Sequence, residues 1–266
     1  MNNKLYKELS LSDREKSIIL GSLLGDGSLK IHRGYANARF SFRHSIAQKE
    51  YFLWKARELA AIGSDKCVFL QKADGWAKLE KLRFQSRALS VLTELYRLTH
   101  EQHHFVIGRS WLNQITLLSL AIWWCDDGSI ISNGRKGVIC TDGFGEKSVR
   151  LLARYMEVVW KVKMHAGPIT RQRDNERIQY WRLWLSTEEL KKFLRIIIPY
   201  IPVSSMIYKF VLLYKDSQLQ QRWISEMETL SGFPRDAIKK AYAERIGKRK
   251  ISENDIVQSL LKIEKS

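Results

Sequence analysis

The feature that most constrains this chain is an internal repeat. The apolar segment Ile19-Leu-Gly-Ser-Leu-Leu-Gly-Asp-Gly27 has a counterpart about a hundred residues later, Leu120-Ala-Ile-Trp-Trp-Cys-Asp-Asp-Gly128. Each segment has the apolar spacing of a buried helix, and each ends in an aspartate followed by a glycine. Because similar segments follow each copy in the same order, we expect two similar halves related by a pseudo-twofold axis.

The periodicity of the chain predicts an α+β fold made of two αββαββα repeats. A capping box from Ser12 to Glu15 starts the first helix, and Gly27 suits a left-handed residue that ends it. We expect repeats over 12–114 and 115–216, followed by a helical extension over 217–266. The predicted strands are 28–33, 38–45, 66–73, 76–85, 129–132, 137–142, 161–170 and 176–186, and the predicted later helices are 46–62, 88–99, 145–160, 187–196, 218–230, 235–246 and 253–264.

Small residues on both apolar helices predict a close helix crossing at the centre of the molecule. Gly21 and Gly25 are four residues apart on the first helix, and Ala121 and Cys125 are four apart on the second. Docking there would bring Asp26 and Asp127 together at two negative helix ends.

Two carboxylates in such a place are unfavourable unless divalent cations lie between them, and Mg²⁺ suits oxygen ligands with open water positions. A Gly-Asp-Gly sequence alone is more typical of a turn, but one motif in each half favours a site. The candidate metal group is Asp26, Asp127, Gly25 and Asp126. For Asp126 a structural role stays open, because it points about 100° away from Asp127 around the helix.

The charge of the chain indicates a polyanionic partner. Lys and Arg number 45 against 28 Asp and Glu, which leaves a net charge of +17. An anionic membrane is disfavoured because the basic residues are not gathered on one amphipathic helix. No long apolar run or signal peptide is found, and three cysteines form no CxxC pair. We expect an intracellular protein, with organelle and prokaryotic cytoplasm both open.

The two motifs resemble those of the LAGLIDADG homing endonucleases, and the likeness covers residues 12–212. The segment "IIIPYIPVSSMIYK" at 196–209 also resembles the single-chain, two-motif branch of that family. The resemblance implies a monomer whose antiparallel sheets form a DNA-binding saddle. It implies a metal-dependent double-strand break in a long asymmetric DNA site. Mg²⁺ is the expected cofactor, with Mn²⁺ as a substitute and Ca²⁺ binding without supporting cleavage.

By the same resemblance, Asp26 and Asp127 are the metal-binding catalytic acids, and Lys209 stabilises charge on the cleaved phosphate. Relatives often place a lysine pair upstream of the second motif, where this chain has "HHFVI". His104 is therefore a candidate catalytic residue that can donate to a phosphate, and a structural role for it is equally open.

Polar and basic residues alternate with apolar ones along the predicted strands, so one sheet face is apolar and the other basic. Such a face can lie in the DNA major groove. A strand of about ten residues covers about ten base pairs, so two halves would cover about twenty. The candidate DNA-binding residues are Lys30, His32, Arg39, Ser41, Arg43, Lys81, Arg83, Tyr180 and Arg182.

Two other functions fit the same motifs. Family members also act as intron maturases, which would make the host intron RNA a partner. A DNA-binding regulator that lost catalysis is the third alternative. Because both motif acids are present, the sequence favours cleavage over either alternative.

Overall fold

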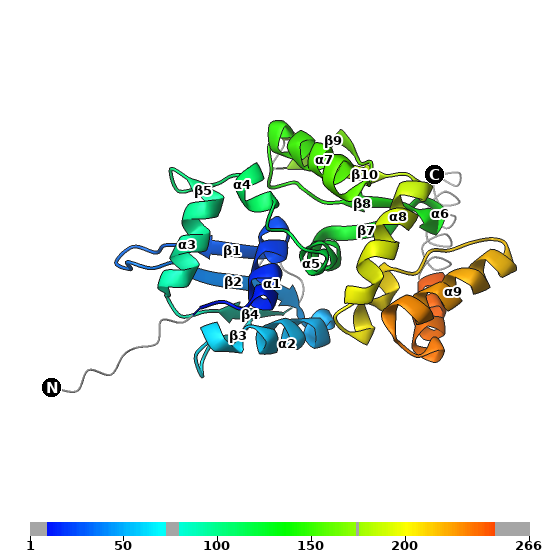
Figure 1. Cartoon of the computed structure of the whole chain (residues 1–266), viewed down its shortest axis with the longest axis horizontal. Coiled ribbons are helices and arrows are strands. Elements are labelled where there is room, and N and C mark those ends of the chain that lie inside the picture. The colour runs from blue at the N-terminus through cyan, green and yellow to red at the C-terminus, as the bar shows by residue number, and fades with distance from the viewer. Residues whose placement is uncertain (1–9, 73–79, 174–175, 248–266) are drawn as a thin grey trace, which may run out of the picture.

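The computed structural model describes residues 10–72, 80–173 and 176–247 and contains two similar halves side by side (Figure 1). Each half holds a four-stranded antiparallel sheet, with strand order β1-β2-β4-β3 in the first and β7-β8-β10-β9 in the second. The two orders are identical once the second half is renumbered. The predicted α+β fold with two pseudo-symmetric repeats is therefore confirmed.

The first half follows the order αββαββα. Its capping box is confirmed, since Ser12 and Glu15 bond each other's backbone N–H groups. The elements are α1 (Asp13–Leu24), β1 (Gly27–Lys30), β2 (Arg39–Ser45), η1 (Ile46–Gln48), α2 (Lys49–Glu58), η2 (Ala60–Ile62), β3 (Val68–Gln71), β4 (Lys81–Gln85) and α3 (Ser90–Thr99). A short hairpin, β5 (His100–Glu101) with β6 (His104–Phe105), and α4 (Arg109–Leu112) connect it to the second half.

The second half repeats the order with one added turn of helix. Its elements are α5 (Leu117–Asp127), β7 (Gly128–Ile131), α6 (Ser132–Arg135), β8 (Lys136–Ile139), α7 (Glu146–Trp160), β9 (His165–Arg173), β10 (Glu176–Leu185), α8 (Thr187–Ile197), η3 (Ile198–Tyr200) and η4 (Ser204–Lys209). α9 (Ser217–Ser231) and a helix over 235–247 follow. The predicted helix at 253–264 lies outside the described residues.

Two local predictions differ from the structure, and three short elements were not predicted. The helix expected at 46–62 is broken into η1, α2 and η2, and nothing predicted the β5–β6 hairpin, α4 or α6. Gly27 is not left-handed; the only glycines with positive φ in the described residues are Gly34, Gly134 and Gly232. Gly25 and Asp26 form the turn between α1 and β1, so Gly27 is already the first residue of the strand. A Cβ at Gly27 would lie 2.8 Å from the backbone oxygen of Ser22. Gly27 is therefore required because a side chain would collide with Ser22, and not because the backbone is left-handed there.

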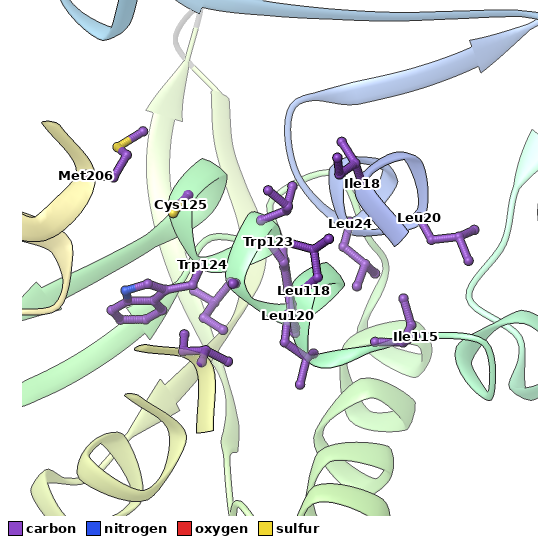
Figure 2. Close-up of a cluster of buried hydrophobic side chains, with 14 of the residues drawn as sticks. Ile18, Leu20, Leu24, Ile115, Leu118, Leu120, Trp123, Trp124, Cys125 and Met206 are labelled. Atoms are coloured by element: carbon purple, nitrogen blue, oxygen red, sulfur yellow. The ribbon is translucent and has the colours of Figure 1, made fainter. Parts of the chain in front are cut away.

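The centre of the molecule is the contact between α1 and α5, with one sheet on either side (Figure 1). Figure 2 shows buried apolar side chains of the two helices, among them Ile18, Leu24, Leu118 and Trp123, around the helix crossing. Both helices are apolar on nearly every side because each is covered by its partner helix and by its own half. No helix in the described part of the chain is long and apolar enough to cross a membrane.

Candidate metal and nucleic-acid site

Two glycines allow α1 and α5 to cross almost backbone to backbone. A Cβ at Gly21 would lie 2.4 Å from the carbonyl oxygen of Ser119, and one at Gly25 would lie 2.5 Å from the Cβ of Asp126. Any side chain at either position would push the helices apart. Asp26 and Asp127 follow this contact directly, so the crossing holds the two halves of the site together.

The face that α5 presents to α1 is displaced by one residue from the predicted one. Ile122 and Asp126 meet the glycines of α1, whereas the predicted Ala121 and Cys125 are fully buried elsewhere on the same helix. Figure 2 shows Cys125 on the side of α5 that faces Met206.

Asp126 is a buried partner of the first half. Its side chain is 0% exposed, and the Lys55 ammonium, also 0% exposed, lies 2.9 Å from Oδ1. Lys55 also donates to Oδ2 at 3.1 Å, the Tyr51 hydroxyl donates to Oδ1 at 2.7 Å, and the Asp26 backbone N–H donates to Oδ2 at 3.3 Å. Both carboxylate oxygens are therefore occupied by donors from the first repeat. The structure supports the structural alternative for Asp126.

Asp26 is partly open to solvent and lies against His44. The Asp26 Oδ2 atom is 3.3 Å from His44 Nδ1, and the Asp26 side chain is 42% exposed. Burial raises the pKa of Asp26, but contact with His44 and the charges of Lys55 and Lys209 outweigh it, so the pKa is lowered overall. Asp26 is accordingly an ionised carboxylate at neutral pH.

Asp127 has the opposite electrostatic character. Burial, followed by the negative charges of Asp26 and Asp126, raises the pKa of Asp127 to about 8, although Lys209 acts in the other direction. An acid in this situation holds a proton at neutral pH unless a cation takes the proton's place. A divalent cation bound between Asp26 and Asp127 would relieve the repulsion between the two carboxylates.

A second grouping of potential metal ligands is less suited to a cation. Ligand atoms of Asp26, His44 and Asp126 all lie within 4.8 Å of one another. However, a cation there would compete with the Lys55 ammonium for the same Asp126 oxygens. A cation held by Asp26 and Asp127 would avoid that competition with Lys55.

Asp127 opens into a cavity of about 950 Å³ between the two halves. Four of the six histidines line it, and His104, the candidate catalytic residue, is exposed there. The His103 ring is held by the Tyr96 hydroxyl at 3.1 Å. The polar lining residues are Ser28, Lys30, His32, Tyr96, His100, His103, His104, Asp127, Thr141 and Asp142. This cavity is wide enough for a backbone phosphate, and it lies beside Asp127, the acid whose pKa is raised.

Lys209 closes the C-terminal end of α5. Its Nζ donates to the carbonyl oxygen of Cys125 and, at 3.2 Å, to that of Asp126, and the residue is 8% exposed. These carbonyls are the unpaired acceptors at the negative helix end, so the ammonium neutralises it. An ammonium has three donors. Lys209 therefore has one left for another acceptor.

Comparison with known proteins identifies the family. The profile of the LAGLIDADG DNA endonuclease family matches residues 16–193, which include both motif helices and both sheets. The chain belongs to this family. It also resembles the solved structure of the homing endonuclease I-WcaI bound to its DNA recognition sequence, with a TM-score of 0.65, 19% identity and coverage of 80% of this chain and 96% of that one.

Curated proteins similar to this LAGLIDADG chain fall into two groups. Protein RecA of Mycobacterium gastri is 30% identical over 219 residues, which are 76% of this chain and 48% of that protein. Cytochrome b mRNA maturase bI2 of Saccharomyces cerevisiae is 26% identical over 203 residues, covering 73% of this chain and 46% of that protein. The Debaryomyces hansenii maturase of that name is 26% identical, covering 72% and 71%. The chain spans about half the length of the first two relatives.

The first sheet of this LAGLIDADG chain has one basic face, as its register demonstrates. Directly paired residues of neighbouring strands point to the same side of a sheet. The basic face carries four such pairs: Ser28 with Ser41, Lys30 with Arg39, Arg43 with Arg83, and Ser45 with Lys81. The opposite face carries Leu29, Phe40, Phe42, Phe84 and His44, which are buried under the helices. The Ser28 and Ser41 hydroxyls bond each other at 3.0 Å, Arg39 stacks on Tyr35, and Arg83 stacks on Phe69.

The second sheet differs in its charge pairing. Arg182 forms a bidentate ion pair with Asp142, with both bonds 2.6 Å long, and the Arg182 side chain is 12% exposed. Arg171 lies 3.6 Å from the same carboxylate. Tyr180 lies two residues from Arg182 on the same side of β10 and is half-buried. The carboxylate thus fixes Arg182 in place, and Arg171 is the more exposed cation of this group.

Sequence reasoning missed His44, Tyr51 and Lys55 as members of this site. A signal was present for His44 and for Lys55. His44 continues the alternation of Phe40 and Phe42, so it had to face the helices, and Lys55 follows Tyr51 by four residues on the apolar face of α2. A lysine on a buried helix face requires an acid nearby.

Proposed function

We propose that this chain is a metal-dependent DNA endonuclease that hydrolyses one phosphodiester bond in each strand of a long, asymmetric site. One observation carries the proposal: the close crossing of α1 and α5 at Gly21 and Gly25 brings the ends of the two motif helices, which carry Asp26 and Asp127, together at the centre of the molecule. There burial, followed by the negative charge of Asp26, raises the pKa of Asp127. Repulsion of this kind is retained at a site that takes up cations. We further propose repeats over 12–114 and 115–216 and an extension over 217–266.

Asp26 and Asp127 would hold Mg²⁺, which when bound polarises the phosphate and supplies an activated water. We expect Mn²⁺ to substitute, and Ca²⁺ to bind without supporting cleavage. His44 keeps Asp26 ionised, and the third donor of Lys209 is available for charge that develops on the phosphate. The exposed His104 can donate to the phosphate on the side of Asp127.

The proposed partner is double-stranded DNA, bound by one monomer. The basic face of the first sheet and the net charge of +17 support it. Because one chain carries both halves, and the halves differ in sequence, the two halves of the DNA site need not be identical. The candidate DNA contacts are Lys30, His32, Arg39, Ser41, Arg43, Lys81, Arg83, Tyr180 and Arg182.

The experiment that tests this function uses the host gene with its intervening sequence removed. Purified protein is incubated with that DNA in Mg²⁺ and, separately, in Ca²⁺. We expect a double-strand break in Mg²⁺ alone, and DNA binding in both. Tight binding without any cut in Mg²⁺ or Mn²⁺ would reject the endonuclease assignment in favour of a DNA-binding regulator.

A second candidate function is help with intron splicing. The observation that favours it is similarity to two cytochrome b mRNA maturases over more than 70% of this chain. Under this alternative the protein binds its host intron RNA. Faster splicing of that RNA in the presence of the protein would support it, and an unchanged splicing rate with saturating protein would reject it.

A further inference from the structure

The chain around Lys209 is held by side chains at four backbone carbonyl oxygens. The end of η4 leaves these oxygens without partners inside the helix. Each is bound by a side chain from elsewhere: Tyr208 O by Arg245 at 3.0 Å, Lys209 O by Trp124 at 2.9 Å, Phe210 O by Trp223 at 3.1 Å and Leu212 O by Gln220 at 3.1 Å. Three of the four donors belong to the C-terminal extension.

The donors of the extension are part of the protein core. Trp223 and Gln220 are each 2% exposed. Gln220 uses both ends of its amide, since its oxygen also accepts the Tyr214 N–H at 2.8 Å. Ile238, from the helix over 235–247, is fully buried as well. The described part of the extension, residues 217–247, therefore packs against the second repeat.

Arg245 connects the Lys209 segment to the strand that leaves the Asp127 motif. One guanidinium nitrogen donates to Tyr208 O and the other donates to Ile130 O, both at 3.0 Å. Ile130 lies on β7, three residues after Asp127. A planar guanidinium holds two acceptors at a fixed separation, which a single ammonium cannot do. One side chain thus sets the spacing between the two segments that carry Lys209 and Asp127.

We propose that the C-terminal extension is a positioning element for the active site, with Arg245 as its principal positioning residue. It fixes the backbone of Lys209 so that the ammonium stays at the end of α5 beside Asp127. The expected effect on the cleavage rate rests on the proposed endonuclease function. The structural consequence, the protection of the Lys209 amine, does not depend on that function.

The test compares Arg245→Ala with a matched control, Arg235→Ala. Arg235 lies in the same 235–247 helix, but its bonds among the described residues are to Ser225, Glu228 and Gln221, all within the extension. We expect Arg245→Ala to slow single-turnover cleavage roughly 10- to 100-fold while DNA affinity in Ca²⁺ changes less than about twofold. Arg245→Lys should recover part of the rate, and Arg235→Ala should match the wild type.

A second readout separates this inference from the proposed function. Acylation of Lys209 by an amine-reactive reagent, followed by mass spectrometry, should be faster in Arg245→Ala than in Arg235→Ala and the wild type. If Arg245→Ala does not fold, Trp223→Phe, which removes the indole N–H donor to Phe210 O and keeps an aromatic ring in the core, replaces it with the same expectation. Equal Lys209 reactivity in the Arg245 and Arg235 variants would overturn the inference, even if the wild type proved unable to cut DNA.

Discussion

Replacing Lys55 with methionine should destabilise the protein strongly, although Lys55 is neither an apolar core residue nor a proposed metal ligand. Methionine fills the same space but leaves the Asp126 carboxylate buried without a cation. The carboxylate would lose donors at 2.9 and 3.1 Å and would retain the Tyr51 hydroxyl and the Asp26 N–H, with His44 Nε2 more distant at 3.8 Å. Two hydrogen bonds to a charged group account for about 3 to 6 kcal/mol, which agrees with the about 3 to 5 kcal/mol measured for broken buried pairs.

For a protein of this size, we expect the melting temperature to fall by about 6 to 20 °C, as measured by calorimetry or circular dichroism. Asp126→Asn should lower the free energy of unfolding by a similar amount, because it leaves the Lys55 ammonium buried without an anionic partner. The double variant should lose less than the sum of the two, with a coupling energy above about 1 kcal/mol. The exposed Arg14–Glu58 pair provides the control, and Arg14→Met should cost under about 1 kcal/mol. Additive losses, or shifts under 2 °C for both single variants, would refute the account of Asp126.

Two further variants test the helix crossing and the second sheet. Gly25→Ala should lower the free energy of unfolding by about 1 to 3 kcal/mol, because the new Cβ would collide with the Cβ of Asp126. Gly143→Ala is the control: a Cβ there would meet open space, so the free energy of unfolding should not change. Arg182 lowers the pKa of Asp142 from its usual 3.8. Arg182→Gln should therefore lower the free energy of unfolding by its full amount above about pH 5, where Asp142 is ionised in both states. The difference from the wild type should shrink as the pH falls below about 4 and Asp142 takes up a proton. A difference that does not depend on pH would contradict the pairing.

Much of the fold could be predicted because local patterns and long-range order agree in this chain. The two apolar helices ending in Asp-Gly, the capping box at Ser12 and the alternation of Phe40 and Phe42 each report directly on structure. The helix at 46–62 could not be predicted correctly, since nothing in its apolar spacing reveals that 3₁₀ turns replace its ends. The left-handed conformation expected for Gly27 is wrong because the turn after α1 is made by Gly25 and Asp26, and the sequence does not show that the strand already begins at Gly27.

The site was less accessible to sequence reasoning because its charges meet across the repeats. The pairing of Asp126 with Lys55 joins residues from different halves, and a difference of one residue in the α5 face decides which acid is buried. Likewise, the link from Arg245 to Tyr208 and Ile130 depends on how the extension packs. Residue spacing within one segment carries no information on such contacts.

The most direct test of the central claim is to locate the metal in a crystal of the protein with its DNA. Mn²⁺ replaces Mg²⁺ at oxygen sites and can be identified by anomalous scattering. The account predicts anomalous peaks in contact with carboxylate oxygens of both Asp26 and Asp127, with Lys55 still on Asp126. A peak held by Asp126 and His44 with Lys55 displaced, or no peak at either motif acid, would contradict it.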